Sequence, residues 1–85
     1  MYWVYILYSK SKDSYYTGSS SDPVRRLSQH NEGWTQSTKS GIPWTMVYQR
    51  KFASKKEAIQ EERRIKKKKS RKYIEFLLEV DSSVK

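Results

Sequence analysis

The stretch "SYYTGSSSDPVRRLSQHNEG", residues 14–33, decides the fold, because a strand signal passes directly into a helix signal within it. "YYTG" is aromatic and closes on a glycine, which predicts a short strand that ends at Gly18. Asp22 followed by Pro23 is a preferred helix start, and Gly33 is a preferred helix stop. The stretch is therefore predicted to hold one strand and one capped helix.

The residues before this stretch predict the partner strand of a hairpin. Residues 2–8, "YWVYILY", are β-branched and aromatic, and the polar "SKSKDS" predicts a connecting loop of about six residues. The period-two alternation of a strand places Val4 and Ile6 on one face of the sheet. It places Tyr5 and Leu7 on the opposite face.

Helical spacing sorts the side chains of the predicted helix. Arg26 and His30 are four positions apart and share a face, whereas Arg25 points elsewhere. Val24 and Leu27 are predicted to face the core. The single histidine of the chain therefore lies beside an arginine on a helix that directly follows a strand.

The second half of the chain predicts one strand and two helices. Residues 33–43 are rich in Gly, Ser and Thr and predict a loop, and "WTMVYQRKF", residues 44–52, predicts the third strand. Ser54 and Glu57 form a capping box at the start of the helix "KKEAIQEERRIKKKK". Ser70 breaks that helix, and "RKYIEFLLEV" predicts a last helix in the order β-β-α-β-α-α. The predicted core-facing stripe of the last helix consists of Ile74, Leu77 and Leu78.

The composition predicts one small cytoplasmic domain. Of the 85 residues, 35% are hydrophobic and 14% aromatic, so aromatic rings supply much of the apolar core. The absence of cysteine fits a reducing cytosol and excludes disulfides and thiolate metal sites. The start "MYWVYILYSK" does not resemble a signal peptide, and no apolar run approaches the ~20 residues of a membrane span. A single domain is predicted over residues 1–80, with residues 81–85 as a frayed tail.

The charge is concentrated toward the C-terminal half. The formal net charge is +9, and eight of the ten residues in "RRIKKKKSRK", residues 63–72, are basic. Such a surface attracts polyanions, so we expect this segment to contact a nucleic-acid backbone; the alternative is a solvated helix face. The predicted nucleic-acid-binding residues are Arg63, Arg64, Lys66, Lys67, Lys68, Lys69, Arg71 and Lys72.

Glu62 is the unusual residue of the long predicted helix. At about 100° per residue it falls between Ala58 and Ile59, inside the apolar stripe, whereas Glu61 lies well to one side. A carboxylate in a buried stripe is costly unless a cation or a metal ion meets it. Two interpretations remain open, a metal site and an internal ion pair with an arginine.

Several of these features recur in a fixed order. Tyr5 lies in the first strand within "VYI", and Tyr16 opens the "YTG" that closes the second strand. Arg26 lies ten residues past Tyr16, His30 follows four residues later, and the helix "KEAIQEERRIKK" follows the third strand. This arrangement, over about residues 2–78, resembles the GIY-YIG nuclease domain, and in particular the small single-domain bacterial proteins related to the UvrC N-terminal domain.

The resemblance implies an α+β fold, with a three-stranded antiparallel sheet flanked by helices. It also implies a set of site residues, which by position are Tyr5, Tyr16, Arg26, His30 and Glu62, with Gly18 as the motif glycine. The sequence departs from the family pattern at two points. The first motif lacks its leading glycine, and no asparagine follows Asn31, whereas well-studied members have one beyond the glutamate helix.

The chemistry that the resemblance implies is hydrolysis of a phosphodiester bond. Glu62 would hold a single Mg²⁺ or Mn²⁺ ion, and Arg26 would bind the scissile phosphate. Tyr5 is the predicted base for the attacking water, with Tyr16 and His30 orienting it or sharing its proton. Because a phenol titrates near pH ~10, we expect Arg26 and the metal to lower the pKa of Tyr5. His30 is the rival base on pKa grounds.

The predicted function is that of a metal-dependent DNA endonuclease, structure-selective or weakly sequence-selective, in DNA repair or recombination. We expect a monomer with DNA as its partner and no membrane contact. The alternative is a non-catalytic nucleic-acid-binding module on the same fold, which the missing asparagine favours. A protein-interaction domain with a merely solvated lysine run is a third class. Taken singly, Tyr5 and Tyr16 could be packing aromatics, and Arg26 and His30 exposed helix residues.

Overall fold

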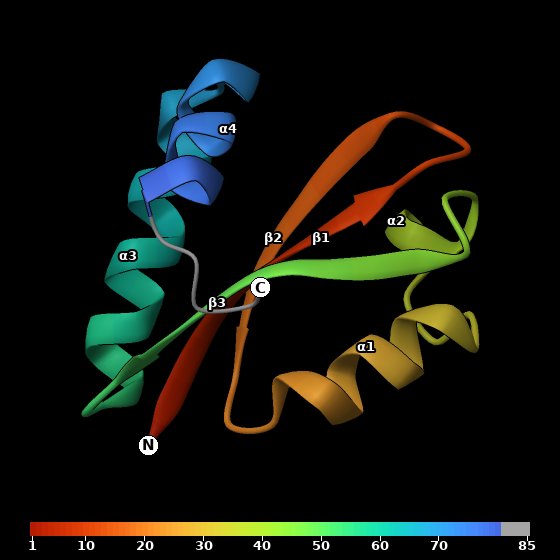
Figure 1. Cartoon of the computed structure of the whole chain (residues 1–85). Coiled ribbons are helices and arrows are strands. Elements are labelled where there is room, and N and C mark those ends of the chain that lie inside the picture. Colours follow the sequence, from red (N-terminus) through yellow and green to blue (C-terminus); the bar gives the residue numbers. More distant parts are fainter. Residues whose placement is uncertain (81–85) are drawn as a thin grey trace.

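Three antiparallel strands form the centre of the molecule, and helices cover both of their faces (Figure 1). The computed structural model describes residues 1–80. Its elements, in chain order, are β1 (Tyr2–Ser9), β2 (Ser14–Ser20), α1 (Pro23–Asn31), α2 (Gln36–Lys39), β3 (Trp44–Phe52), α3 (Lys55–Lys68) and α4 (Arg71–Val80). The predicted α+β class and antiparallel sheet are confirmed, and the order gains one short helix, α2. The predicted frayed tail, residues 81–85, lies outside the described residues.

β1 is the central strand, with β2 and β3 on its two edges. Tyr5 of β1 pairs directly with Gly18 of β2. The hairpin loop is shorter than predicted, since it spans only residues 10–13. The prediction that Gly18 ends the second strand is wrong, because β1 is long enough to pair with β2 as far as Ser20.

One face of β1, the aliphatic face, lies under α3 and α4 (Figure 1). Val4 and Ile6 point to this face, as the strand alternation predicts, and both are fully buried. The buried cluster on this face consists of Val4, Ile6, Tyr48, Ala58, Ile65 and Leu77. Burial of these apolar side chains holds α3 and α4 on the sheet.

The opposite face of β1, the aromatic face, lies toward α1 and α2 (Figure 1). Tyr5 and Leu7 are buried there with Trp44, the first residue of β3. Tyr16 and Leu27 are partly buried and pack against the same cluster. The predicted division of β1 between two faces is therefore confirmed.

α1 begins and ends where the sequence predicts. The Asp22 carboxylate accepts a hydrogen bond from a first-turn backbone N–H at 3.1 Å, Pro23 follows, and Gly33 takes a left-handed φ of +83° after the helix. The prediction that Val24 faces the core is wrong, because its side chain is 69% exposed. The cap fixes a phase that buries Pro23 and His30, and Val24 lies about 100° from Pro23 around the helix.

α2 is a single helical turn within the predicted loop of residues 33–43. Thr38 in this turn is buried, and its backbone oxygen accepts hydrogen bonds from the Trp44 indole at 2.7 Å and from the Gly41 N–H at 3.1 Å. Tertiary contacts therefore hold the turn in place. Its four residues are too few for hydrophobic periodicity to predict it.

The helix start predicted at Ser54 is confirmed, because Ser54 Oγ accepts a hydrogen bond from the N–H of Glu57 at 3.2 Å. The Glu57 carboxylate accepts from Ser54 Oγ at 3.2 Å and not from the Ser54 N–H, so the capping box is only half formed. Lys69 follows the helix with a left-handed φ of +47°, and Ser70 then caps α4 by accepting the N–H of Tyr73 at 3.2 Å. The predicted stripe of α4 packs on the aliphatic face through Ile74, Leu77 and Leu78. No helix within residues 1–80 is long and apolar enough to cross a membrane.

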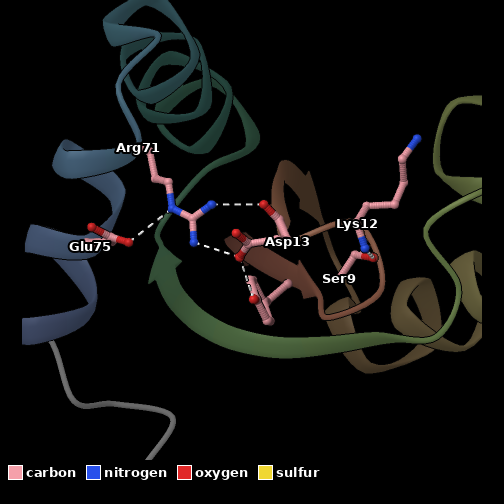
Figure 2. Close-up of polar contacts among 6 residues, drawn as sticks. Ser9, Lys12, Asp13, Arg71 and Glu75 are labelled. Carbon is pink, nitrogen blue, oxygen red and sulfur yellow. Dashed lines mark hydrogen bonds and ion pairs between the residues drawn. The ribbon is translucent and has the colours of Figure 1, made fainter.

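A charged contact ties α4 to the hairpin loop (Figure 2). Arg71 donates from Nη2 to Asp13 Oδ1 and from Nη1 to the Asp13 backbone oxygen, both at 2.8 Å. Its Nε donates to Glu75 one turn later at 3.1 Å. We refer to these contacts among Asp13, Arg71 and Glu75 as the Arg71 clasp. They join two parts of the chain that are 58 positions apart.

Candidate active site

Tyr5 lies at the centre of the candidate site. Its side chain is only 1% exposed, and its hydroxyl lies 3.1 Å from His30 Nε2, within hydrogen-bonding distance. Gly18 lies directly opposite on β2. A Cβ atom at that position would come within 2.6 Å of the Tyr5 hydroxyl oxygen, so only glycine fits without displacing the ring. The glycine of the second motif is therefore required by the tyrosine of the first.

Hydrogen bonds orient His30, which is fully buried. Its Nδ1 lies 2.8 Å from Thr38 Oγ1, and the Thr38 hydroxyl donates its one proton to the backbone oxygen of Thr35 at 3.3 Å. Thr38 must then accept from His30 Nδ1–H, which leaves Nε2 to accept the proton of Tyr5. With this assignment of the hydrogens, Tyr5 donates to His30, His30 donates to Thr38, and Thr38 donates to the backbone oxygen of Thr35. We call this directed series of bonds the Tyr5–His30–Thr38 chain.

Burial sets the protonation states along this chain. It raises the pKa of Tyr5 above the usual 10.0, although nearby Arg26 acts in the opposite direction. Burial also lowers the pKa of His30 below 6.5, and here the charge of Arg26 acts in the same direction. Tyr5 is therefore a neutral phenol and His30 a neutral imidazole near neutral pH. Arg26 acts on the pKa of Tyr5 in the expected direction, but desolvation outweighs the guanidinium, so the pKa is raised overall.

Tyr16 lies on the same face of the sheet as Tyr5 and is more accessible. It pairs with Leu7, and the centroid of its ring lies 4.9 Å from that of His30 and 6.5 Å from that of Tyr5. The side chain is half-buried, and its hydroxyl forms no hydrogen bond with the described part of the chain. A phenol in this state can bind a water molecule or a substrate oxygen.

Arg26 faces the site and Arg25 faces solvent, as the helical spacing predicts. The Arg26 guanidinium donates from Nη1 to Gln29 Oε1 at 2.7 Å and from Nη2 to Thr35 Oγ1 at 3.5 Å. Its effect on the pKa of Tyr5, second to that of burial, places it near the Tyr5 hydroxyl. The two bonds hold the guanidinium half-buried and leave further N–H donors for an anion such as phosphate.

Glu62 approaches the site from the aliphatic face, around the edge strand β2. Its Oε1 accepts a hydrogen bond from the Ser19 hydroxyl at 2.5 Å, and its Oε2 pairs with Lys66 Nζ at 2.7 Å. Ser19 directly follows Gly18, and the charge of Glu62 adds to the effect of burial in raising the pKa of Tyr5. The ion pair foreseen as one interpretation is therefore present, with a lysine in place of an arginine.

Glu61 provides a comparison with its neighbour Glu62. The exposed fraction of the side chain is 13% for Glu61 and 18% for Glu62, so the expected difference in burial is absent. The two glutamates differ instead in the direction in which their side chains point. Glu61 pairs with Arg64 along α3 at 2.7 Å, whereas Glu62 reaches Ser19 on β2.

Glu62 is the group of this site best suited to a metal ion. Residues 1–80 contain no cluster of three or more His, Cys, Asp or Glu side chains that could hold an ion. One carboxylate beside the Ser19 hydroxyl still fits Mg²⁺ or Mn²⁺, because these hard cations accept one or two carboxylates with waters and phosphate oxygens as the other ligands. An ion at this carboxylate would compete with the Lys66 ammonium.

The basic segment, residues 63–72, contains paired and unpaired cations. Three are paired with carboxylates, in the pairs Arg64–Glu61, Lys66–Glu62 and Arg71–Asp13. Those that form no ion pair with residues 1–80 are Arg63, Lys67, Lys68, Lys69 and Lys72. All eight basic side chains are exposed, so the segment presents a positively charged surface along α3 and the start of α4.

Sequence reasoning missed Thr38 and Ser19, which bind His30 and Glu62 respectively. Both lie in stretches rich in Ser and Thr, where no pattern singles out one hydroxyl. The alternative that His30 is an exposed helix residue is wrong, since it is buried. A buried histidine needs hydrogen-bond partners for both ring nitrogens, and this need was the one available clue that a hydroxyl such as that of Thr38 lies next to His30.

Asn31 has a structural role at the end of α1. Its Nδ2 donates to the backbone oxygen of Trp44 at 3.0 Å, and its Oδ1 accepts from the Trp44 N–H at 2.6 Å. These bonds tie α1 to the start of β3. Asn31 therefore does not substitute for the asparagine that the family resemblance leads one to expect.

A comparison with known families identifies the family and agrees with the fold. The family model described as the GIY-YIG catalytic domain matches residues 1–74. This chain belongs to the GIY-YIG family. Membership places it in a family of nucleases that act on DNA, and the match includes Tyr5, Tyr16, Arg26, His30 and Glu62.

The GIY-YIG chain is similar to several UPF0213 proteins. It is 38% identical to one from Streptococcus pneumoniae over 78 residues, which are 91% of this chain and 78% of that protein. It is 39% identical to one from Halobacterium salinarum over 67 residues, which are 78% of this chain and 86% of that protein. A solution NMR structure of a UPF0213 protein from Bacillus halodurans matches with a TM-score of 0.60 and 35% identity, covering 95% of this chain and 86% of that one. The names of these relatives state no activity.

Proposed function

We propose that this protein is a metal-dependent DNA endonuclease with structure-selective or weakly sequence-selective cutting, acting in DNA repair or recombination. The observation that carries the proposal is the grouping of polar side chains from four elements around the buried Tyr5 hydroxyl and the adjoining Gly18–Ser19 segment of β2. These side chains are Tyr5 from β1, Tyr16 from β2, Arg26 and His30 from α1, and Glu62 from α3. Membership of a nuclease family supports the same chemistry.

Phosphodiester hydrolysis requires an oriented water molecule and neutralisation of the charge that develops on phosphate. Arg26 supplies a planar cation with N–H donors to spare, beside the phenols. Glu62 would hold the single Mg²⁺ or Mn²⁺ ion, with Ser19 orienting the carboxylate. Such an ion, when bound, supplies positive charge to the phosphate oxygens.

Within this proposal we assign contact with the attacking water to Tyr16. The Tyr5 side chain is buried and its proton is directed toward His30, so water does not reach it from solvent. The Tyr16 hydroxyl is accessible and forms no hydrogen bond within residues 1–80. The Tyr5–His30–Thr38 chain then acts as the rigid support of the site. The assignment of Tyr5 as the base stays a prediction that the burial of Tyr5 disfavours.

A non-catalytic nucleic-acid-binding module is the second candidate function. Two observations favour it. The Glu62 carboxylate is already paired with Lys66. The single asparagine of the chain, Asn31, is bound to the Trp44 backbone. The basic surface of residues 63–72 serves either function, because phosphate contacts position a nucleic acid without reading its sequence.

The test is a cleavage assay with matched variants. Purified protein is incubated with branched, nicked and continuous duplex DNA, in Mg²⁺, in Mn²⁺ and in EDTA. We expect metal-dependent cleavage that falls by about 100-fold or more in Glu62→Gln and in Arg26→Ala. The neighbouring variants Glu61→Gln and Arg25→Ala are the controls, because they remove the same groups from positions that face away from the site.

Three outcomes would contradict the proposal. Binding to these DNAs without cleavage in either metal would establish the non-catalytic module instead. Equal losses in Glu61→Gln and Glu62→Gln would remove the specific role of Glu62. Binding that does not weaken with salt would reject both nucleic-acid functions, because phosphate contacts release counterions.

A further inference from the structure

A groove opens between β2 and the junction of α3 with α4, next to the candidate active site. Its volume is about 420 Å³, near the lower end of the roughly 300–1,000 Å³ typical of ligand pockets. Tyr15 and Tyr16 line it from β2, Ile65 from α3 and Ile74 from α4. We call it the β2–α4 groove. Its walls offer aromatic and aliphatic surface of about the size that one nucleotide requires.

Three cations border this groove. Lys66, Lys69 and Arg71 all line it, and Arg71 crosses from α4 to the hairpin loop at its margin (Figure 2). Asp13 is the one carboxylate in its lining, and the Arg71 clasp already neutralises it. The groove is therefore apolar in its walls and positively charged at its rim, which complements a nucleobase attached to phosphate.

The groove is continuous with the candidate active site. Glu62 and Lys66 are four positions apart on one face of α3, and Lys69 directly follows the end of this helix. Lys66 joins the two regions, because it pairs with Glu62 at 2.7 Å and also lines the groove. Tyr16 is shared in the same way, as a wall of the groove and a neighbour of His30 at 4.9 Å.

The backbone of Lys69 ends α3 at this rim of the groove. Its φ of +47° and ψ of +37° are left-handed, a conformation that favours glycine at the end of a helix. A lysine there is strained, and its ammonium forms no bond with residues 1–80 that would offset the strain.

We propose that the β2–α4 groove binds one unpaired nucleotide of a DNA strand, next to the phosphodiester at the active site. The base would pack on Tyr15 and Ile74, and its phosphate would contact Lys69. A base stacked within a duplex cannot enter such a groove, whereas a base in a gap or flap can. The groove thus supplies a structural reason for selectivity toward gapped or flapped DNA. The inference rests on the proposed function, because it takes the scissile phosphate to lie between Tyr16 and Glu62.

The experiment measures binding in EDTA, so that cleavage plays no part. Fluorescence anisotropy gives the affinity of the full-length protein for a duplex with a one-nucleotide gap on a template strand and for the continuous duplex. We expect about tenfold tighter binding to the gapped duplex, and a change in the fluorescence of 2-aminopurine at the unpaired position. Ser14→Phe, which fills the groove from β2, should abolish both effects.

Lys69→Gly tests the rim without harming the fold. It relieves the left-handed strain, so its melting temperature should equal or exceed that of the wild type. Its affinity for gapped DNA should nevertheless fall about fivefold, and the dependence of log affinity on log salt should become shallower by about one. Lys56→Ala is the control, because Lys56 is an exposed lysine at the opposite end of α3. It should change both affinities by less than about twofold.

Retained preference for gapped DNA in Ser14→Phe, or equal losses in Lys69→Gly and Lys56→Ala, would overturn the proposal. Loss of fold in Ser14→Phe would leave the decision to Lys69→Gly. Preference for gapped DNA without cleavage in any metal would refute the endonuclease and leave the groove proposal standing. Cleavage without any preference for unpaired nucleotides would refute the groove proposal alone. In that case the open edge of β2 would remain as a surface for a protein strand.

Discussion

The two faces of β1 are built from alternate residues of one strand, yet different interactions hold them together. On the aliphatic face, Val4 and Ile6 are buried in apolar contacts with α3 and α4. On the aromatic face, the buried Tyr5 and His30 are polar and belong to a directed series of hydrogen bonds. No buried side-chain nitrogen or oxygen within residues 1–80 lacks a partner. Volume therefore decides which residues fit one face, and hydrogen-bond direction decides which fit the other.

The largest effect on stability is expected from Ile6→Ala on the aliphatic face. The variant removes buried methyl and methylene groups and leaves a cavity, so the free energy of unfolding should fall by about 2–5 kcal/mol. Urea denaturation followed by circular dichroism measures it. Val24→Ala is the control and should change stability by less than ~0.5 kcal/mol, because Val24 is exposed. A loss below ~1 kcal/mol for Ile6→Ala would show that the face is loosely packed.

Gly18→Ala should be the most damaging change on the aromatic face. The added Cβ would lie 2.6 Å from the Tyr5 hydroxyl oxygen, so the ring must move, at a cost of about 1–3 kcal/mol. A double-mutant cycle with Tyr5→Ala measures how much of the loss in stability comes from the contact between Gly18 and Tyr5. The cost of Gly18→Ala should nearly vanish in the Tyr5→Ala background. The same cost in both backgrounds would place the strain elsewhere in β2.

Thr38→Val tests the direction of the Tyr5–His30–Thr38 chain. Valine keeps the shape of threonine but leaves the His30 Nδ1–H buried without an acceptor, which should cost about 1–3 kcal/mol. Nitrogen NMR of the imidazole should show the Nδ1–H tautomer in the wild type, and Thr38→Ser should preserve it. An Nε2–H tautomer in the wild type would reverse the direction that we assign.

The neutral state of His30 predicts a dependence of stability on pH. Its pKa in the folded protein is lowered below the 6.5 of the unfolded chain, chiefly by burial and also by the charge of Arg26. Below pH 6.5 the unfolded state therefore binds more protons, so stability should be constant above this pH and decrease as the pH falls toward 5. Urea midpoints across this range measure the effect. His30→Gln should flatten the profile, and an unchanged slope would assign it to other groups.

Asp13→Asn should give the smallest effect, because the Arg71 clasp is exposed on both sides. Arg71 holds the pKa of Asp13 below 3.8 by its hydrogen bond, with a further contribution from the Tyr8 hydroxyl. That stabilisation is present above pH 3.8 and is lost as the pH falls through the folded value. A thermal melt at low and high salt should show a small loss for Asp13→Asn that salt reduces. A large loss at high salt would mean that the clasp holds α4 by more than charge.

The sequence predicts the features of this fold that arise from local patterns. The alternation in β1 and the helix starts at Asp22–Pro23 and at Ser54 follow from neighbouring residues alone, and each is confirmed. α2 could not be predicted, because contacts with Trp44 and Gly41 hold it.

The candidate site also has features that follow from local sequence patterns and features that depend on tertiary contacts. Helical spacing correctly predicted that Arg26 and His30 share the face of α1 that lies toward Tyr5. The stripe position did not separate Glu62 from Glu61, whose side chains are about equally buried. The roles of these residues in a site stay predictions. The net pKa shift of Tyr5 depends on burial by elements distant in the sequence, which no spacing rule contains. Ser19 and Thr38 escaped notice for the same reason, because each gains its role from a partner on another element.

The Arg71 clasp also has a consequence for the order in which the protein matures during synthesis. Tyr5, Tyr16, Arg26 and His30 leave the ribosome early, but Glu62 emerges later and Arg71 later still. The hairpin and α1 can therefore assemble before the carboxylate that completes the site exists in the nascent chain. The partner of Asp13 is made 58 residues after it, so the Arg71 clasp at the margin of the β2–α4 groove cannot form before Arg71 is synthesised. A nascent chain beside RNA and other polyanions thus carries an unfinished site until α4 docks.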